Sequence, residues 1–332
     1  MSRVSVVIPT WNRADLVESV VRSLRDQTRQ PDEVLVVDNG STDGSVDVAR
    51  GLGAEVIALE RNFGFAVAVN RGIEAATGDW ILILNNDVML PPDWLKVLAA
   101  AAEESGAAFA VGKLLQSDEG HTIDGSWDLI SRGACAWRCG YGRPDSTVWS
   151  TRRSIRIAPM TAALFHKRVF EQVGLLETRF ESYLEDVDFG LRCAAEGLDG
   201  VYVPEATAVH MSHSTLGKAS YRVIHLSSRN QVLLIAKHYP KTTIRRFAWP
   251  LLIGQFLAVI AFAKTGQIRA ALTGKRDGWR LWREFRATVP ADPGVIERVL
   301  AESENEIRAL QRSVGFEPYW RLYFALGGGR GV

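Results

Sequence analysis

The alternation of short apolar runs with amphipathic helical stretches, over the first hundred residues, constrains the fold of this chain most. Val4–Ile8 is mostly β-branched, and a helical stripe of apolar residues from Leu16 to Leu24 follows it. Further apolar runs are Val34–Val37, Glu55–Leu59, Trp80–Leu84 and Ala107–Val111. Largely apolar strands that are mostly followed by helices predict an α/β fold, with a mostly parallel sheet covered by helices on both faces.

Polar clusters follow the predicted strands at the points where the strands end. They are Pro9-Thr10-Trp11-Asn12, Asp38, Asn62-Phe63-Gly64 and Asn85-Asn86-Asp87. Ligands of open α/β sheets bind at the carboxyl ends of the strands, so these four clusters are expected to converge on one edge. The pattern therefore predicts an active site at that edge.

A third acidic signal is the stretch Glu185-Asp186-Val187-Asp188, which begins a predicted helix with Arg192 four residues beyond Asp188. Neighbouring carboxylates raise each other's pKa, which suits a general base. The structural alternative is that acidic residues favour the first turn of a helix, with Asp188 and Arg192 forming an i,i+4 pair. Asp38 and Asp87 upstream favour the catalytic interpretation.

Asp87, on a predicted turn after a strand, is placed to hold a divalent cation such as Mg²⁺ or Mn²⁺. His210, expected in a polar loop, could add a nitrogen ligand, which suits Mn²⁺ better than Mg²⁺. Asp38 could accept from a nucleobase N–H or a ribose hydroxyl. The alternatives are a turn or cap for Asp38 and for Asn85-Asn86-Asp87, and a solvated histidine.

The chain has few cysteines, Cys135, Cys139 and Cys193, which suggests a reducing compartment and free thiols, with no zinc site. The start of the chain has the pattern of a buried strand and not of a signal peptide, so a cytoplasmic location is expected. Net charge is +1, yet residues 237–286 hold eleven Lys and Arg against two acidic residues. This asymmetry suggests a basic part that faces an anionic partner.

Residues 112–158 are predicted to form hairpins or a lid, and helices alone follow residue 220. The uncharged run Phe247–Ala263 is shorter than the ~20 residues of a comfortable membrane span. A spanning helix, an interfacial or re-entrant helix, and a helix buried in the core or in a homodimer all remain open for it.

The ordered motifs together resemble a known family. Val6–Asn12, Val36–Gly44 and Arg61–Phe65 look like the nucleotide-binding half of family 2 glycosyltransferases. Leu84–Asp87 resembles the DxD metal motif of that family, and Tyr183–Asp188 resembles its ED motif. The resemblance extends from Ser2 to Ser214. It implies a GT-A fold with a Rossmann-like sheet, a nucleotide-sugar donor, a divalent metal ion and inversion at the anomeric carbon.

The resemblance also implies roles for single residues. Asp38 would recognise the base, Asp87 would bind the metal on the diphosphate, and His210 would lie by the metal or diphosphate. Asp186 would be the general base, with Glu185 beside it. Asn85 stands where the DxD motif has its first Asp, so fewer charges would hold the metal. The residues Asn62-Phe63-Gly64-Phe65 are similar to a rhamnosyltransferase-like branch of the family.

These features lead to an expected organisation. Residues 1–220 would form the glycosyltransferase domain, with a nucleotide-binding half at 1–111 and an acceptor half at 112–220. Residues 221–332 would form a basic, helical, membrane-associating region. The expected partners are a dTDP-, UDP- or GDP-sugar, a glycan or polyprenyl-diphosphate-linked acceptor and the anionic inner face of a bacterial plasma membrane. No nucleic acid is expected, and a homodimer is possible.

Three other functions compete with sugar transfer. A nucleotidyltransferase would need an early glycine-rich loop with a basic residue, and a dinucleotide oxidoreductase would need G-x-G-x-x-G after the first strand. The chain has Pro9-Thr10-Trp11-Asn12 at that position. An inactive membrane-attached carbohydrate-binding or scaffold protein is favoured only by Asn85.

Overall fold

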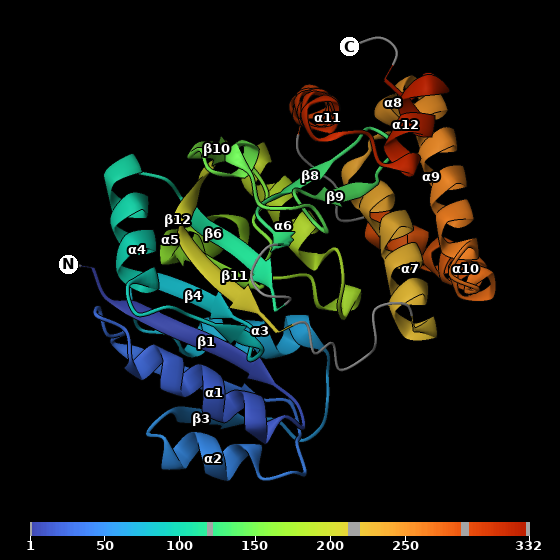
Figure 1. The fold of residues 1–332 in the computed structure, drawn as a ribbon. Coiled ribbons are helices and arrows are strands. Elements are labelled where there is room, and N and C mark those ends of the chain that lie inside the picture. The colour runs from blue at the N-terminus through green and yellow to red at the C-terminus, as the bar shows by residue number, and fades with distance from the viewer. Residues whose placement is uncertain (1, 118–121, 212–219, 287–291, 330–332) are drawn as a thin grey trace. The chain divides into compact units, whose positions relative to one another are not determined.

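The computed structural model describes residues 2–117, 122–211, 220–286 and 292–329, and Figure 1 shows its ribbon. The chain divides into two compact units. The sheet unit contains residues 1–127 and 138–213, and the helical unit contains residues 128–137 and 214–332. Residues 112–220 were all expected in the glycosyltransferase domain, whereas residues 128–137 fold with the C-terminal helices.

The sheet unit is built on one sheet with the strand order β10-β12-β6-β11-β4-β1-β2-β3. Its main strands are β1 Val4–Thr10, β2 Glu33–Asp38, β3 Glu55–Ala58, β4 Trp80–Leu84, β6 Phe109–Gln116, β11 Ala162–His166 and β12 Gly200–His210. The short strands are β5 Val88–Met89 and β7 Ile123–Gly125, with β10 Arg153–Ile155 at one edge.

The main strands share one direction except for β11. β1 pairs in parallel with β2 and β4, and β2 pairs in parallel with β3. β11 is antiparallel to both β4 and β6, so β6 regains the direction of β4, and β12 is parallel to β6. The predicted α/β fold with a mostly parallel sheet is confirmed.

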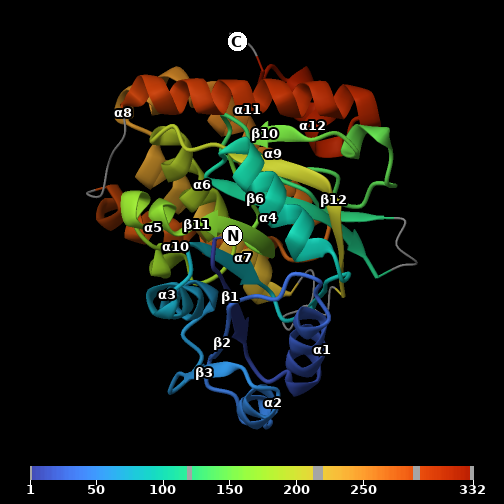
Figure 2. The ribbon, with the colours of Figure 1, turned by 90° about the vertical axis from the view of Figure 1, so that its left-hand side faces the viewer.

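Successive side chains of each strand point to opposite faces of the sheet, and both faces are buried. Val4, Val6 and Ile8 belong to a core that includes apolar residues of α1 (Ala14–Arg25) and α4 (Trp94–Ser105). Val7 points to the other face, where α3 (Phe65–Ala75) packs on β1, and Figure 2 shows α1 and α3 on opposite sides. A Cβ on Gly72 of α3 would lie 2.1 Å from Val7 Cγ1, so only glycine allows this close packing.

Two further helices cover the face on which α3 lies. Phe165 of β11 makes ring contacts with Phe170 of α5 (Lys167–Val173) and with Phe189 of α6 (Glu185–Ala195), at centroid distances of 5.4 and 5.5 Å. α2 (Ser45–Gly51) packs against α1 and β3. The ring contacts of Phe165 fix α6, the predicted acidic helix, against the sheet.

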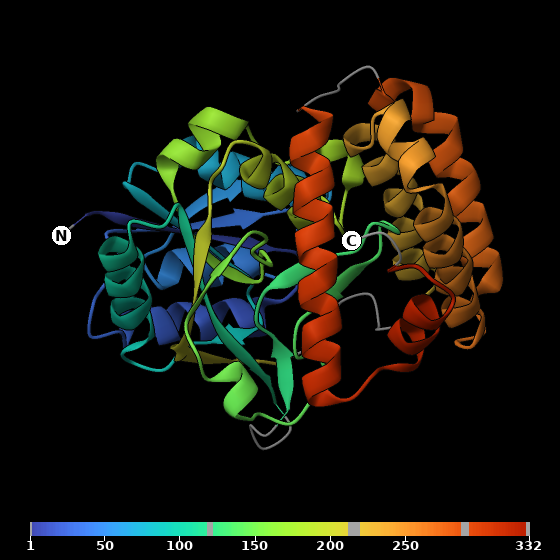
Figure 3. The same cartoon turned by 90° about the horizontal axis from the view of Figure 1, so that it is seen from above.

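The helical unit consists of six helices and one hairpin in the residues that the structure describes. The helices are α7 Tyr221–His238, α8 Lys241–Arg246, α9 Ala248–Ala263, α10 Ile268–Arg286, α11 Pro293–Val314 and α12 Pro318–Ala325, and the hairpin is β8 Asp128–Ile130 with β9 Ala136–Arg138. α7 and α10 pack side by side along their lengths. α11 is the long helix near the middle of Figure 3.

A buried ion pair joins the hairpin to α11. Arg132 Nη2 lies 2.8 Å from Glu304 Oε1, and the side chains are 4% and 1% exposed. The Arg132 backbone N–H and the Tyr323 hydroxyl both donate to Glu304 Oε2, at 2.9 and 2.7 Å. Every oxygen of this buried carboxylate therefore has a partner, which a charge needs in a dry core.

We expect Glu304→Ala to destabilise the protein by about 3–5 kcal/mol, because removing one partner leaves the Arg132 charge buried without compensation. Urea denaturation followed by tryptophan fluorescence measures the change. Asn305→Ala, an exposed position on the same helix, is the matched control and should change the free energy of unfolding by less than ~0.5 kcal/mol. Equal stability of the two variants would contradict a structural role for the pair.

None of the helices in the described ranges is long and apolar enough to cross a bilayer. The run Phe247–Ala263 forms α9, which is buried on one side and exposed on the other.

Candidate active site

The ends of β1, β2 and β4 bring three of the predicted polar clusters together. Thr10 is the register partner of Asp38, where both strands end. Asn86, which follows β4, donates its side-chain amide to Thr10 Oγ1 over 2.9 Å. In the loops beyond, Thr42 N–H donates to Asn12 Oδ1 over 2.8 Å. Pro9, inside β1, pairs with β2 next to these residues.

Only one of the two oxygens of the Asp38 carboxylate has a hydrogen-bond partner among the described residues. Its Oδ2 accepts from the Ser41 backbone N–H over 2.9 Å, which is the turn-capping role that the sequence left open. Its Oδ1 is buried and has no hydrogen-bond partner among the described residues. A buried acceptor without a partner costs about 1–3 kcal/mol, so this oxygen is suited to receive an N–H or hydroxyl of a ligand.

Asn39 joins the loop after β2 to the fourth cluster, and sequence reasoning missed it. Its amide donates to Asn62 Oδ1 over 3.0 Å and to the Gly64 carbonyl over 3.1 Å. Its Oδ1 accepts from the Phe63 N–H over 2.9 Å. The only sequence signal for Asn39 is its place beside Asp38, because its partners are more than twenty residues away.

A carboxylate–imidazole–carboxylate chain lies beyond β4. His210 Nε2 is 3.1 Å from Asp87 Oδ1, and His210 Nδ1 is 2.7 Å from Asp124 Oδ2. β5 holds this geometry, because it pairs with the end of β12, and the Met211 N–H donates to the Asp87 carbonyl over 2.8 Å. Asp124, from β7, is a second residue that sequence reasoning missed.

His210 was expected in a polar loop, and that expectation is wrong. It is the last residue of β12, an eleven-residue strand. The register of β12 against β6 shifts between Val203 and Thr207. Pro204 interrupts the apolar run at this shift, so the sequence pattern indicates a strand that ends before His210. Burial lowers the pKa of His210, but its hydrogen bonds to Asp124 and Asp87 outweigh this and raise the pKa to about 9.

This cluster suits a divalent cation that a ligand helps to hold. Asp87 offers an oxygen, and His210 would offer Nε2 once a cation replaces the proton there. Asn85 Oδ1 is buried without a hydrogen-bond partner in the described residues. Carboxylate, amide and imidazole donors together suit Mn²⁺, and Mg²⁺ takes the oxygens. No group of three or more His, Cys, Asp or Glu in the described ranges could hold a metal alone. Substrate oxygens would therefore have to complete the coordination.

The acidic helix α6 carries the second candidate centre. Asp186 Oδ1 accepts from the Val187 N–H over 2.8 Å, and its Oδ2 lies 3.3 Å from Arg138 Nη2. Burial and the neighbouring charge of Asp186 raise the pKa of Glu185 well above its usual range. Glu185 therefore holds a proton more tightly than an ordinary glutamic acid does.

Asp188 forms the i,i+4 pair with Arg192 that was the structural alternative for the acidic stretch. Its side chain is fully buried and pairs with Arg192 one turn later at 3.2 Å, as an i,i+4 pair. Arg192 also donates to the carbonyls of Val173 and Leu175. Asp188 therefore anchors α6 to the preceding segment.

The backbone before α6 is strained and contacts the Asn62 loop. Glu181, Tyr183 and Leu184 all have positive φ, between 63° and 71°, which residues other than glycine rarely adopt. The Ala66 N–H donates to the Glu181 carbonyl over 3.2 Å, and a Cβ on Gly64 would lie 3.0 Å from that oxygen. The fourth polar cluster is thus tied to the start of the acidic helix.

Arg138 connects the acidic helix with the histidine cluster. Its side chain packs over Gly125, where a Cβ would lie 2.7 Å from Arg138 Cδ, and Gly125 follows Asp124. Its guanidinium reaches Asp186 at the other end. A series of contacts through His210, Asp124 and Arg138 therefore links Asp87 to Asp186 within the sheet unit.

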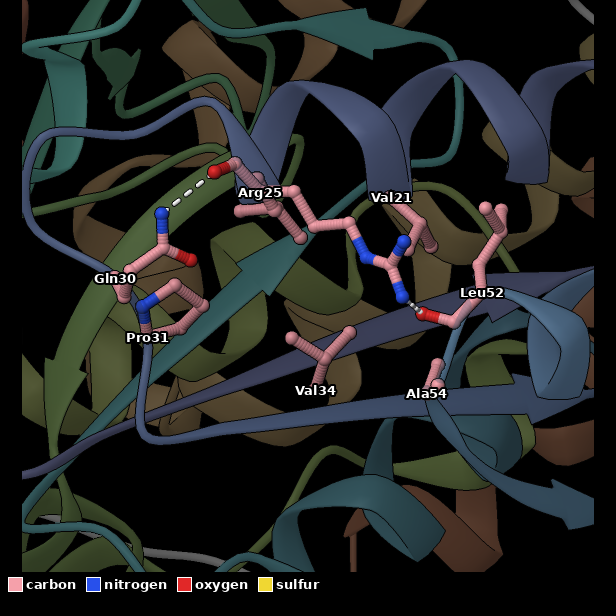
Figure 4. Close-up of a pocket in the computed structure, with 9 residues that line it drawn as sticks. Val21, Arg25, Gln30, Pro31, Val34, Leu52 and Ala54 are labelled. Carbon is pink, nitrogen blue, oxygen red and sulfur yellow. Dashed lines mark hydrogen bonds between the residues drawn. The ribbon is translucent and has the colours of Figure 1, made fainter.

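A cavity of about 160 Å³ lies at the opposite edge of the sheet. Figure 4 shows it between the end of α1 and the starts of β2 and β3, lined by residues that include Val21, Arg25, Val34 and Ala54. Arg25 donates across it to the Leu52 carbonyl. None of its lining residues is a carboxylate or belongs to the polar clusters at the strand ends, so this cavity belongs to the packing of α1 and not to the candidate active site.

The comparisons with known proteins identify the family. Residues 5–174, over half of the chain, match the model of the family described as Glycosyl transferase family 2. The chain belongs to glycosyltransferase family 2. This glycosyltransferase is 29% identical over 259 residues to N-acetylglucosaminyl-diphospho-decaprenol L-rhamnosyltransferase of Mycobacterium tuberculosis, which covers 70% of this chain and 84% of that protein.

Two solved structures are similar to the glycosyltransferase in fold. The mannosyltransferase PcManGT from Pyrobaculum calidifontis, in complex with GDP-Man and Mn²⁺, matches with a TM-score of 0.54 and 18% identity, over 99% of this chain and 86% of that one. GalNAc-T7 with UDP, GalNAc and Mn²⁺ matches with a TM-score of 0.63 and 13% identity, over 96% and 59%. At these identities the likeness concerns the fold alone, and the predicted GT-A fold is confirmed.

Proposed function

We propose that the glycosyltransferase moves a sugar from a nucleoside-diphosphate donor to the hydroxyl of a lipid-linked glycan, with inversion, during assembly of a bacterial cell-surface polysaccharide. The observation that carries this proposal is the edge formed by β1, β2 and β4, where the buried oxygens Asp38 Oδ1 and Asn85 Oδ1 have no partner among the described residues. Unsatisfied acceptors at the carboxyl ends of strands suit a polar ligand such as a nucleotide sugar.

The donor would lie along this edge. Asp38 Oδ1 would accept from the base or ribose, while Pro9, Thr10 and Asn12 shape the loop beside it. Asn39 holds Asn62 and Gly64 in place, so the loop of residues 61–65 would border the same pocket. The hydrogen bond from Asn86 to Thr10 would hold in place the turn that carries Asn85 and Asp87. These residues orient the donor.

Asp87 and His210 would hold a divalent cation, Mg²⁺ or Mn²⁺, with Asn85 as a neutral oxygen donor. The bound cation would neutralise charge that develops on the leaving diphosphate. Asp124 accepts from His210 Nδ1 and thereby presents Nε2 to the cation, as second-shell carboxylates do in metal sites. Both solved relatives were determined with Mn²⁺, which supports a divalent cation in this one.

Asp186 would act as the general base. The acceptor hydroxyl gives its proton to Asp186 as its oxygen attacks the anomeric carbon, and the bond from that carbon to the diphosphate oxygen breaks. The nucleoside diphosphate leaves with the electron pair, so the anomeric configuration inverts in one displacement. Arg138, whose guanidinium lies 3.3 Å from Asp186 Oδ2, would hold that carboxylate in position.

The similarity to a rhamnosyltransferase suggests L-rhamnose as the transferred sugar and a sugar on a polyprenyl diphosphate as the acceptor. Such an acceptor resides in the membrane, so the enzyme would work at the inner face of the plasma membrane. Screening dTDP-, UDP- and GDP-sugars by thermal shift, with and without Mn²⁺, tests the donor, because a ligand bound only by the native state raises the melting temperature.

The proposal is supported if a nucleotide sugar raises the melting temperature of the protein and nucleoside diphosphate is released from it only when the acceptor is present. An inactive carbohydrate-binding protein would bind sugars without this release, and a nucleotidyltransferase would consume a nucleoside triphosphate. Stabilisation by no nucleotide sugar at all, under conditions where the protein is folded, would contradict the proposal.

We expect Asp124→Asn to weaken Mn²⁺-dependent donor binding by about 10–100-fold, because the amide no longer fixes the orientation of His210 as a carboxylate does. Isothermal titration with a nucleoside diphosphate, with and without Mn²⁺, measures the loss. Asp47→Asn, which alters an exposed carboxylate on α2, is the control. An unchanged Mn²⁺ requirement in Asp124→Asn would contradict the positioning role.

A further inference from the structure

One side of α9 exposes large apolar residues and no charge. Trp249, Leu252, Phe256 and Ile260 recur at helical spacing and are between 37% and 60% exposed. The residues between them, such as Leu251 and Leu257, are buried in the helical unit. From Ala248 to Ala263 the helix contains no charged residue. A soluble protein rarely leaves such a contiguous stripe in water without a function for it.

α12 extends the stripe. It packs against α9, and the Trp249 indole N–H donates to the Leu326 carbonyl over 3.0 Å. Leu322 and Leu326, one helical turn apart, are 48% and 46% exposed. The apolar docking surface, defined here as Trp249, Leu252, Phe256, Ile260, Leu322 and Leu326, therefore draws on two helices that are far apart in sequence.

α10, which also packs against α9, combines exposed apolar and basic residues. Trp279 is 61% exposed and stacks on Trp282 at a centroid distance of 4.6 Å. Arg269 and Arg283 are exposed on the same helix, and Lys264 is exposed at the end of α9. Tryptophan with basic residues is typical of helices at the headgroup level of a bilayer.

The charge around the apolar docking surface identifies the occupant. Residues 237–286 carry eleven basic and two acidic side chains, so the region is strongly positive. A second copy of the chain would bring like charges together, which opposes association. An anionic lipid surface complements both the charge and the apolar stripe. The sixteen residues of α9 span only about 24 Å, less than the hydrocarbon core, so the helix would lie in the interface.

We propose that the apolar docking surface inserts between the headgroups of an anionic bilayer, with α9 parallel to the membrane plane. The proposal deepens the proposed function, since a lipid-linked acceptor would be met at that membrane, but the binding itself needs neither donor nor acceptor. The test is flotation of the full chain with vesicles of phosphatidylglycerol and phosphatidylcholine in equal parts, and with vesicles of phosphatidylcholine alone.

The wild type is expected to float with the anionic vesicles and to stay in solution with the neutral ones. The double variant Leu252→Glu, Phe256→Glu should lose at least about tenfold in partitioning, because exposed apolar contacts are replaced by charges that the anionic surface repels. Lys264→Gln, Arg269→Gln and Arg283→Gln should each weaken binding by about fivefold at low salt, and less at high salt. Tyr141→Ser, an exposed aromatic residue of the sheet unit, is the control and should float as the wild type does.

Three outcomes would overturn the proposal. They are a folded wild type that never floats, Gln variants that float with the anionic vesicles as well as the wild type does, and a stable dimer in sedimentation that Leu252→Glu, Phe256→Glu converts to monomers without any lipid binding. The charge variants alter exposed side chains, so they test the proposal even if the double variant folds poorly. Flotation without sugar transfer would contradict the proposed function alone, and transfer to soluble acceptors without flotation would contradict the docking surface alone.

Discussion

Asp186→Asn is expected to lower the rate of sugar transfer by about 10²–10⁴-fold, because the amide cannot take the proton of the acceptor hydroxyl. Donor binding should stay within about twofold of the wild type, since Asp186 lies on α6 and not among the strand ends that would hold the nucleotide. Steady-state rates and a titration with the donor measure the two effects separately.

The matched control for Asp186→Asn is Glu185→Gln. Burial and the charge of Asp186 raise the pKa of Glu185, which favours its neutral form, and glutamine imitates that neutral form. We expect this variant to keep most of its activity. If Glu185→Gln abolished transfer and Asp186→Asn did not, the roles of the two carboxyl groups would have to be exchanged. If neither mattered, the acidic start of α6 would be a helix cap only.

The second large effect is expected for Asp87→Ala. Loss of the only carboxylate in the predicted metal motif should weaken metal-dependent donor binding by at least about 100-fold and reduce turnover with it, because the cation would bridge protein and diphosphate. Calorimetric titration with the nucleoside diphosphate, with Mn²⁺ and with excess chelator, measures the loss. Chelation should abolish the activity of the wild type, and added Mn²⁺ or Mg²⁺ should restore it.

Glu55→Ala, an exposed carboxylate on β3, is the control for Asp87→Ala and should bind donor and metal normally. Asn85→Asp provides a further contrast, since it restores a second negative charge at the position where this chain has an amide. That variant should bind the cation more tightly. Full activity of the wild type in excess chelator would refute the metal assignment, whatever the variants do.

Local patterns were sufficient to predict the first strands of the sheet and the edge at which the polar clusters meet. β-Branched runs such as Val4–Ile8 form central strands because both faces of the sheet are buried. Thr10, Asp38 and Asn86 meet because the ends of neighbouring parallel strands coincide in register. The acidic helix was predicted to begin at the acidic stretch, and α6 begins at Glu185, because acidic residues favour the first turn of a helix.

The features that were not predicted depend on contacts between distant residues. Asp124 comes from a short strand in the irregular region, and only the pairing of β7 with β6 brings it towards His210. The true length of β12 was hidden by the register shift near Pro204. For Phe247–Ala263 the sequence left three environments open, because an apolar run without polar spacing does not tell which side of a helix will be covered.

One measurement tests the central claim most directly, namely the anomeric configuration of the product formed from a nucleotide sugar and a lipid-linked acceptor. We predict that nuclear magnetic resonance will show inversion relative to the donor, with one nucleoside diphosphate released for each sugar transferred, and only in the presence of a divalent cation. Retention of configuration, or transfer that continues without any divalent cation, would contradict the account.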